Sequence, residues 1–211
     1  MQKDWPPEGY SEPREYDKNE RHIIGIAFVI AGVFAVPALL PVHEGVTAYW
    51  VMWSDLAAVL NISYLTTAVG GTVTSMVGIY VLFRKVMVPI HEGIHYGVGL
   101  LLELNPRFGY EEMMFHKNPN VVALSTNIPA WKNMAMLIAP FAIIGLLSWG
   151  LVQVSGGLVA GIAAIVLWIN SAASAQDLYH YVRLLRMNPE TKFANFEEGN
   201  QIRTEYAVPE Q

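Results

Sequence analysis

Two histidines and a glutamate, in the run His91-Glu92-Gly93-Ile94-His95, are the residues of this sequence best suited to chemistry. If the run is helical, His91 and His95 project from one face, four residues apart. Two imidazole nitrogens placed in this way can reach one tetrahedral zinc ion at about 2.0–2.1 Å. Glu92 is adjacent to that face and has the position of a general base that takes a proton from water. The HExxH spacing therefore predicts a zinc site with Glu92 as its base.

A polar cluster without a metal is the alternative for the same three side chains. The motif lies in the mostly apolar stretch from Val86 to Leu102. Ionisable residues in such a stretch are costly unless they face a polar cavity or bind something. This cost favours the metal site over the metal-free cluster.

A catalytic zinc usually has three protein ligands, so the third must come from elsewhere in the chain. Cysteine is absent, which leaves His, Asp and Glu. Val98 and Leu101 stand where a metzincin has its glycine and third histidine, so that class is excluded. Asp177 is the preferred candidate, because an aspartate within an apolar span usually has a function. Glu111 and Glu112, in an expected loop, are the alternatives.

The neighbours of Asp177 in the sequence are also candidates. Helical spacing would place four polar side chains in one stripe facing the motif: Asn170, Ser174, Asp177 and Tyr181. His180 could orient or replace a ligand, although a histidine at the membrane interface is the plainer interpretation. The plainer interpretation of Asp177 is a residue at a helix end that pairs with Arg183.

The elements that must carry these residues are apolar helices of membrane-spanning length. Hydrophobic residues make up 53% of the 211 residues and the mean hydropathy is +0.32, which is high for a soluble domain. A helix crosses the hydrocarbon core with roughly 20 residues. Four runs approach that length: Ile23 to Val42, Ile62 to Phe83, Asn133 to Val154 and Gly157 to Tyr181. The sequence therefore predicts an all-α membrane protein with four transmembrane helices.

All 13 Lys and Arg residues fall on one side of such a four-span chain. The connections 43–61 and 155–156 contain none. Because cytoplasmic flanks carry the excess of basic residues, we expect a multi-pass protein of the cell membrane with both termini in the cytoplasm. With four spans and both termini on one side, the motif stretch, Val86 to Leu104, must return to the side of the membrane on which it begins. We therefore predict a re-entrant or interfacial motif helix, with a fifth full span as the alternative.

The other segments are expected to flank one helical, metalloprotease-like domain, residues 23–183. Residues 1–22 are predicted to form a flexible cytoplasmic arm, and residues 184–211 a cytoplasmic tail. Segment 105–132 mixes aromatic and charged residues with turn residues, which predicts a short β-hairpin that could hold a peptide by strand addition. A solvated loop is the alternative. The mild net charge of −5 gives no indication of nucleic-acid binding.

The order of these features resembles the putative zincin peptidase family of small integral membrane proteins, over about residues 60 to 205. The resemblance rests on apolar spans, on HEGIH after the basic pair Arg84-Lys85, and on Asn170 followed by Asp177-Leu178 in the last span. By its motifs that family is similar to the site-2 intramembrane metalloproteases. In those proteins two histidines and an aspartate from a later span hold zinc.

The resemblance implies a zinc-dependent endopeptidase in which His91, His95 and Asp177 hold Zn2+ and Glu92 activates water. Asn170 and His180 are candidates for binding substrate or orienting the ligands. The expected substrate is a membrane-associated peptide or protein that reaches the site near the cytoplasmic face.

Two other functions remain as alternatives. One is a non-catalytic membrane scaffold or regulator that keeps the metal for stability. The other is a metal or solute carrier, which ranks last because the spans other than the fourth carry little beyond Thr, Ser and Gly. The oligomeric state is not predicted.

Overall fold

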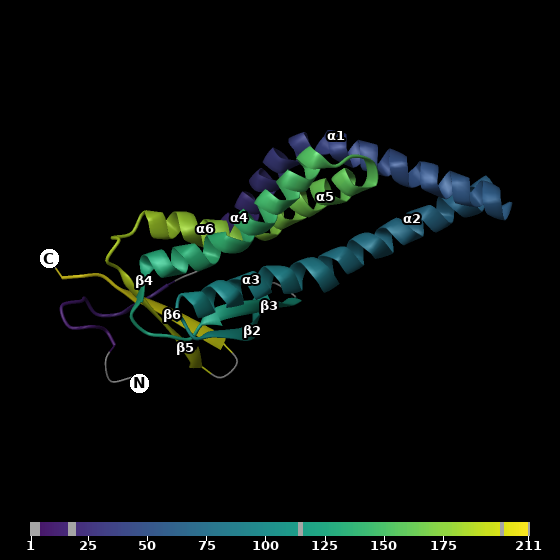
Figure 1. Cartoon of the computed structure of the whole chain (residues 1–211). Helices are drawn as coiled ribbons and strands as arrows, with labels where there is room; N and C mark the ends of the chain where they lie inside the picture. The colour runs from purple at the N-terminus through teal and green to yellow at the C-terminus, as the bar shows by residue number, and fades with distance from the viewer. Residues whose placement is uncertain (1–4, 17–19, 114–115, 199–200, 211) are drawn as a thin grey trace. The chain divides into compact units, whose positions relative to one another are not determined.

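The computed structural model describes residues 5–16, 20–113, 116–198 and 201–210, most of which are helical. The helices are α1 (Glu20–Leu60), α2 (Tyr64–Val81), the π-helical turn η1 (Leu82–Met87), α3 (Val88–Leu101), α4 (Ala130–Val154), α5 (Gly157–Ala173) and α6 (Ala175–Leu185). The strands are β1 (Arg14–Glu15), β2 (Pro106–Met113), β3 (His116–Ala123), β4 (Ile128–Pro129), β5 (Lys192–Glu198) and β6 (Gln201–Ala207). Figure 1 shows these elements along the chain.

The chain divides into two compact units. The polar unit consists of Met1–Gly25, His91–Pro140 and Ala175–Gln211, and the apolar unit of Ile26–Ile90 and Phe141–Ser174. The sequence of the polar unit contains 11 of the 13 basic residues, whereas that of the apolar unit contains four charged residues in all: Glu44, Asp55, Arg84 and Lys85. The apolar unit therefore has the composition of a membrane-embedded body.

Within the described residues, three helical runs are long and apolar enough to cross a membrane: His22–Leu60, Tyr64–Leu101 and Ala130–Val154. The pair α5 and α6, bent by 52°, is a fourth candidate if it counts as one broken span. The four predicted apolar runs are thus all helical. The predicted count of four spans is met only if the bent pair crosses the membrane as one.

The first helix is longer than the sequence predicted. α1 continues through Pro37 and Pro41 as far as Leu60, so most of segment 43–61 is helix and not a connection. Apolar helices tolerate proline when neighbouring groups satisfy the freed carbonyls. The helix ends before Asn61, which has the left-handed φ of 55° that is common just beyond a helix end.

The motif helix continues α2 and does not turn back on itself, so the predicted re-entrant form is corrected. Tyr64–Leu101 is one helical run of 38 residues. At 1.5 Å per residue this run is about 57 Å long, nearly twice the roughly 30 Å of a hydrocarbon core. The basic pair Arg84-Lys85 lies in its middle, within η1. The residues after that pair can therefore leave the hydrocarbon without a break in the helix, and their interfacial position stays a prediction.

The π-helical turn explains how the helix passes Pro89. A proline within a helix has no N–H, and its ring clashes with the carbonyl four residues earlier, here that of Lys85. Within η1 the hydrogen bonds reach back five residues, and the N–H of Val88 donates to the carbonyl of Phe83. The wider turn accommodates the ring, so α3 starts in line with α2.

The last apolar run bends at Ser174 and is not one helix. Serine and asparagine are unfavourable within helices because their side chains compete for backbone hydrogen bonds. The Ser171 hydroxyl donates to the carbonyl of Leu167, a bond that tends to bend helices. Asn170 and Asp177 consequently belong to different helices, and the predicted polar stripe is interrupted. Asp177 lies in the first turn of α6.

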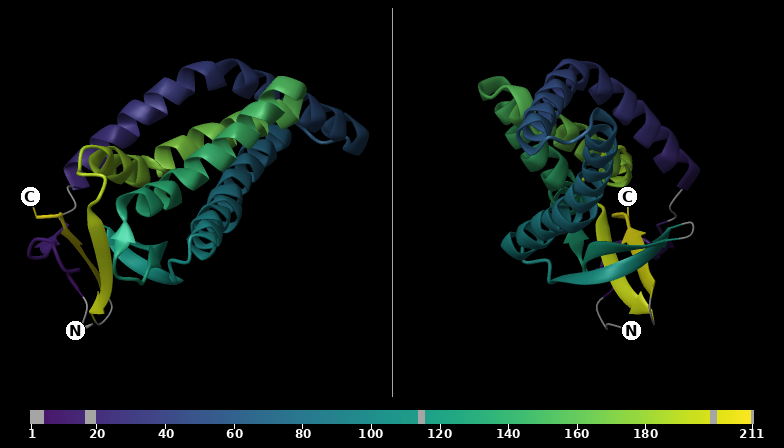
Figure 2. Two further views of the ribbon diagram at one scale, coloured as in Figure 1. Left: turned by 60° about the vertical axis from the view of Figure 1, so that its left-hand side comes forward. Right: turned by 90° about the vertical axis from the view of Figure 1, so that its right-hand side faces the viewer.

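The structure is mostly helical, as predicted, but it also contains two small sheets, of which only the hairpin was predicted. β2 and β3 form an antiparallel hairpin in which Phe108 pairs with Val121, which confirms the hairpin predicted within residues 105–132. The other sheet has the strand order β1-β6-β5-β4, so a strand near the beginning of the chain pairs with a strand near its end; Figure 2 shows this sheet from two further sides. The segments expected as a flexible arm (1–22) and a tail (184–211) thus contribute strands. The backbone of β1 pairs with that of β6, so each segment provides hydrogen-bond partners for the other.

A buried core connects the helices and strands of the polar unit. Its members come from the N-terminal segment, the turn after α3, the hairpin, β4, α4, α6 and β5: Tyr16, Leu104, Ala123, Ile128, Ala130, Met136, Leu184 and Phe193. These apolar contacts hold α3 and α6 in one body. The helices that carry the candidate ligands are therefore positioned by the same core.

In the apolar unit, α1 and α5 approach each other at a pair of glycines. A Cβ atom added to Gly45 would lie 2.6 Å from the Cα of Gly161, and one added to Gly161 would lie 2.6 Å from the Cα of Gly45. Such distances are shorter than real Cβ contacts, so only glycine fits at both positions. Small residues at helix contacts are the usual way in which membrane helices pack closely.

Replacing Gly45 by valine is expected to force α1 and α5 apart and to lower the free energy of unfolding by about 1–3 kcal/mol. Thermal unfolding of the detergent-purified protein measures the loss. Gly32→Val in the same helix is the control, because a Cβ at Gly32 meets nothing within 4 Å. Equal destabilisation by both variants would contradict the close contact.

Candidate metal centre

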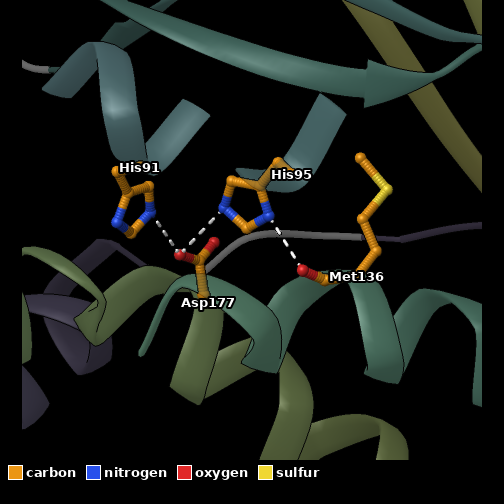
Figure 3. Close-up of polar contacts among 4 residues, drawn as sticks. All are labelled: His91, His95, Met136 and Asp177. Carbon is orange, nitrogen blue, oxygen red and sulfur yellow. Dashed lines mark hydrogen bonds and ion pairs between the residues drawn. The ribbon is translucent and has the colours of Figure 1, made fainter. Parts of the chain in front are cut away.

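Three predicted ligands come together from two helices of the polar unit. His91 and His95 extend from one face of α3, with ring centroids 4.9 Å apart. Asp177 extends from the first turn of α6, where the helix dipole favours a negative charge. Figure 3 shows the carboxylate pointing at both imidazole rings.

One carboxylate oxygen of Asp177 contacts both imidazoles. Its Oδ2 atom lies 3.1 Å from Nε2 of His91 and 3.4 Å from Nε2 of His95. In a tetrahedral zinc site with ligand distances of 2.0–2.1 Å, neighbouring ligand atoms are about 3.3–3.4 Å apart. The three side chains offer ligand atoms that all lie within 4.8 Å of one another. The cluster is therefore compact enough to hold one metal ion.

The second ring nitrogen of His95 is fixed by the backbone. Nδ1 lies 2.8 Å from the carbonyl oxygen of Met136 on α4, as Figure 3 shows. A carbonyl only accepts, so Nδ1 carries the proton and donates. In neutral His95 the lone pair is then on Nε2, which faces Asp177. Metal-binding histidines usually have such a partner, because it sets the tautomer and the orientation of the ring.

Glu92 lies beside the cluster with an unsatisfied oxygen. Its Oε2 atom is buried and has no hydrogen-bond partner among the residues that the structure describes. The groups around its carboxylate are His91, His95, Asp177 and the backbone amide of Val121 on β3. A buried oxygen without a partner is costly. The unpartnered oxygen of Glu92 therefore fits a site that receives a water molecule or a substrate group.

The charges of the site also fit a divalent cation. Glu92 and Asp177 bring two carboxylates into one small region. Without a metal, a hydrogen bond from Nε2 of His95 to Asp177 would require an imidazolium, because Nδ1 already carries a proton. A dication balances both carboxylates and leaves the imidazoles neutral. This balance favours the metal site over the metal-free cluster.

The alternative partner predicted for Asp177 lies elsewhere. The guanidinium carbon of Arg183 is 4.1 Å from the centroid of the Tyr16 ring. The groups that contact the carboxylate of Asp177 are the imidazoles of His91 and His95. The geometry therefore agrees with Asp177 as a ligand and not with a pair at the helix end.

Of the other predicted site residues whose side chains the structure describes, none belongs to this cluster. Asn170 is buried in α5, within the apolar unit. His180 is buried in α6, and its Nδ1 atom lies 3.2 Å from the hydroxyl of Tyr16. The side chains of Glu111 and Glu112 lie outside the described residues. Sequence reasoning missed the carbonyl of Met136 and the amide of Val121, because backbone groups carry no residue signal.

Comparison with known proteins agrees with this site. The model of a family described as "Putative zincin peptidase" matches residues 85–192, a little more than half of the chain. The matched range contains His91, Glu92, His95 and Asp177. Comparisons with curated proteins and with solved structures found no match. The chain thus belongs to the putative zincin peptidase family, as the sequence resemblance implied.

Proposed function

We propose that this protein is a zinc-dependent, membrane-embedded endopeptidase that hydrolyses a membrane-associated peptide near the cytoplasmic face. The observation that carries the proposal is the cluster of His91, His95 and Asp177 beside the buried carboxylate of Glu92. Membership of a zincin family supports the metallopeptidase class.

Each residue of the site has a separate task in this proposal. His91, His95 and Asp177 would hold the ion, and Met136 keeps the ring of His95 in place through its carbonyl. Zinc, when bound, supplies a Lewis acid that polarises a peptide carbonyl and lowers the pKa of water to roughly 7. Glu92 takes the proton from the attacking water and then passes it to the leaving amine.

The hairpin offers a place for the peptide next to Glu92. β3 pairs with β2 along one edge, and the amide of Val121 faces the Glu92 carboxylate. Two residues on, the carbonyl of Ala123 accepts from the Asn195 side chain. Alternate residues of β3 thus direct backbone groups away from β2. An extended peptide could add to this edge up to the position that Asn195 occupies.

The charge distribution supports the proposed orientation. The polar unit contains the site, both ends of the chain and 11 of the 13 basic residues. Because basic residues concentrate on the cytoplasmic side, this unit is assigned to the cytoplasmic face and the apolar unit to the bilayer.

Removing any one ligand is expected to abolish metal binding. Detergent-purified protein should contain about one zinc ion per chain, and His91→Ala or Asp177→Ala should contain almost none, because a catalytic zinc has only three protein ligands. Mass spectrometry measures the metal content. His43→Ala, at an exposed position of α1, is the control that retains zinc. Wild-type protein that binds no added zinc would contradict the proposal.

The substitution Glu92→Gln is expected to retain zinc and to lower peptide cleavage at least about 10²-fold, because an amide cannot take a proton from water. Cleavage of a fluorogenic library of apolar peptides by the full chain in detergent measures the loss. Glu103→Gln, exposed beyond the end of α3, is the control. Zinc binding with unchanged cleavage in Glu92→Gln would exclude this role. Zinc binding without any cleavage by the wild type would favour the non-catalytic scaffold.

A further inference from the structure

Tyr16 is a buried aromatic residue that the proposed reaction does not use. Only 8% of its surface is exposed. Its backbone N–H donates to the carbonyl of Thr204 on β6, at 2.9 Å. Its ring packs edge-on against Phe193 and Tyr206, with centroid distances of 5.9 and 6.3 Å. The N-terminal segment is therefore anchored to the β5–β6 hairpin at this residue.

The same side chain also contacts the helix that carries Asp177. The Tyr16 hydroxyl lies 3.2 Å from Nδ1 of His180, and Arg183 lies over the ring. Burial raises the pKa of Tyr16 to about 12, against the opposing effect of Arg183, so the hydroxyl keeps its proton at neutral pH. His180 lies three residues after Asp177 on α6, and Arg183 three residues after His180. The first residue of α6 that contacts Tyr16 is therefore within one helical turn of the candidate ligand Asp177.

α6 depends on such contacts for its direction. It has 11 residues and follows the 52° bend at Ser174, so α5 does not continue into it. A helix of this length is marginal by itself and is held by the packing of one face. Its buried residues are Ala175, His180 and Leu184. His180 connects that buried face to Tyr16, so Tyr16 helps to fix where the first turn of α6 lies.

We propose that Tyr16 is a positioning residue of the metal centre, which fixes α6 through His180 and Arg183 and thereby places the carboxylate of Asp177 between the two imidazoles. The inference rests on the proposed metal site. Tyr16 does not contact the ligands in this scheme and acts through the helix. The N-terminal segment then contributes to the proposed metal site through Tyr16, whereas Trp5 only joins the same segment to β6.

The test is the zinc affinity of the full chain in detergent, measured by competition with a chromophoric chelator. Tyr16→Phe removes only the hydroxyl and should weaken zinc binding about tenfold, the lower end of the effect of residues that support ligands. Trp5→Phe is the matched control. It removes the hydrogen bond of 3.0 Å from Trp5 Nε1 to Glu205, which joins the same segment to β6 and not to α6. Its zinc affinity should equal that of the wild type.

A second pair of variants tests the same contact from α6. His180→Asn keeps an amide that can exchange a hydrogen bond with Tyr16, and it should retain most of the zinc affinity. His180→Leu fills similar space without that bond and should lose affinity as Tyr16→Phe does. This pair decides the question if Tyr16→Phe does not fold.

The outcomes separate this inference from the proposed function. If the wild type binds zinc and Tyr16→Phe binds it equally well, only the positioning role is overturned. The role is also overturned if Trp5→Phe weakens binding as much as Tyr16→Phe, because the effect would then be general loss of the sheet. A wild type that binds no zinc overturns both.

Discussion

The contact of one Asp177 oxygen with the Nε2 atoms of His91 and His95 is the interaction on which the site depends. The two histidines are four residues apart, so a single helix places them together. The aspartate is 82 residues beyond His95, and only tertiary structure brings it there. Two carboxylates and two imidazoles in one buried region are unfavourable unless a cation or a proton balances them. That balance is what a divalent metal provides.

Two irregular features of the helices make this contact possible. The π-helical turn η1 carries the chain past Pro89 without a break, so α3 begins in line with α2. At Ser174, by contrast, the helix bends, so α6 runs in a different direction from α5. The histidines thus lie on a long, continuous helix and the aspartate on a short, separate one. Such a short helix takes its position from its neighbours, which here include the core of the polar unit.

The sequence predicted the parts that depend on local spacing or on composition. The histidine pair, the apolar runs and the hairpin at 105–132 are of this kind, because a helical period, a run of apolar residues or a group of turn residues is sufficient evidence. The β1-β6-β5-β4 sheet was missed because its strands pair across the length of the chain, as in Arg14 with Tyr206. The continuation of α1 beyond Val42 was missed because His43 and Glu44 interrupt the apolar run, although the helix continues through them to Leu60.

The division of charge between the two units fits the proposed combination of a membrane-embedded body with hydrolytic chemistry. Hydrolysis needs water and ionised side chains, whereas the hydrocarbon core excludes both. In this chain the apolar unit has four charged residues in its sequence, and the three candidate ligands, Glu92 and the hairpin belong to the polar unit. The 38-residue run Tyr64–Leu101 passes from one unit into the other at the motif itself. The boundary between Ile90 and His91 is therefore where the apolar helix reaches the candidate metal ligands.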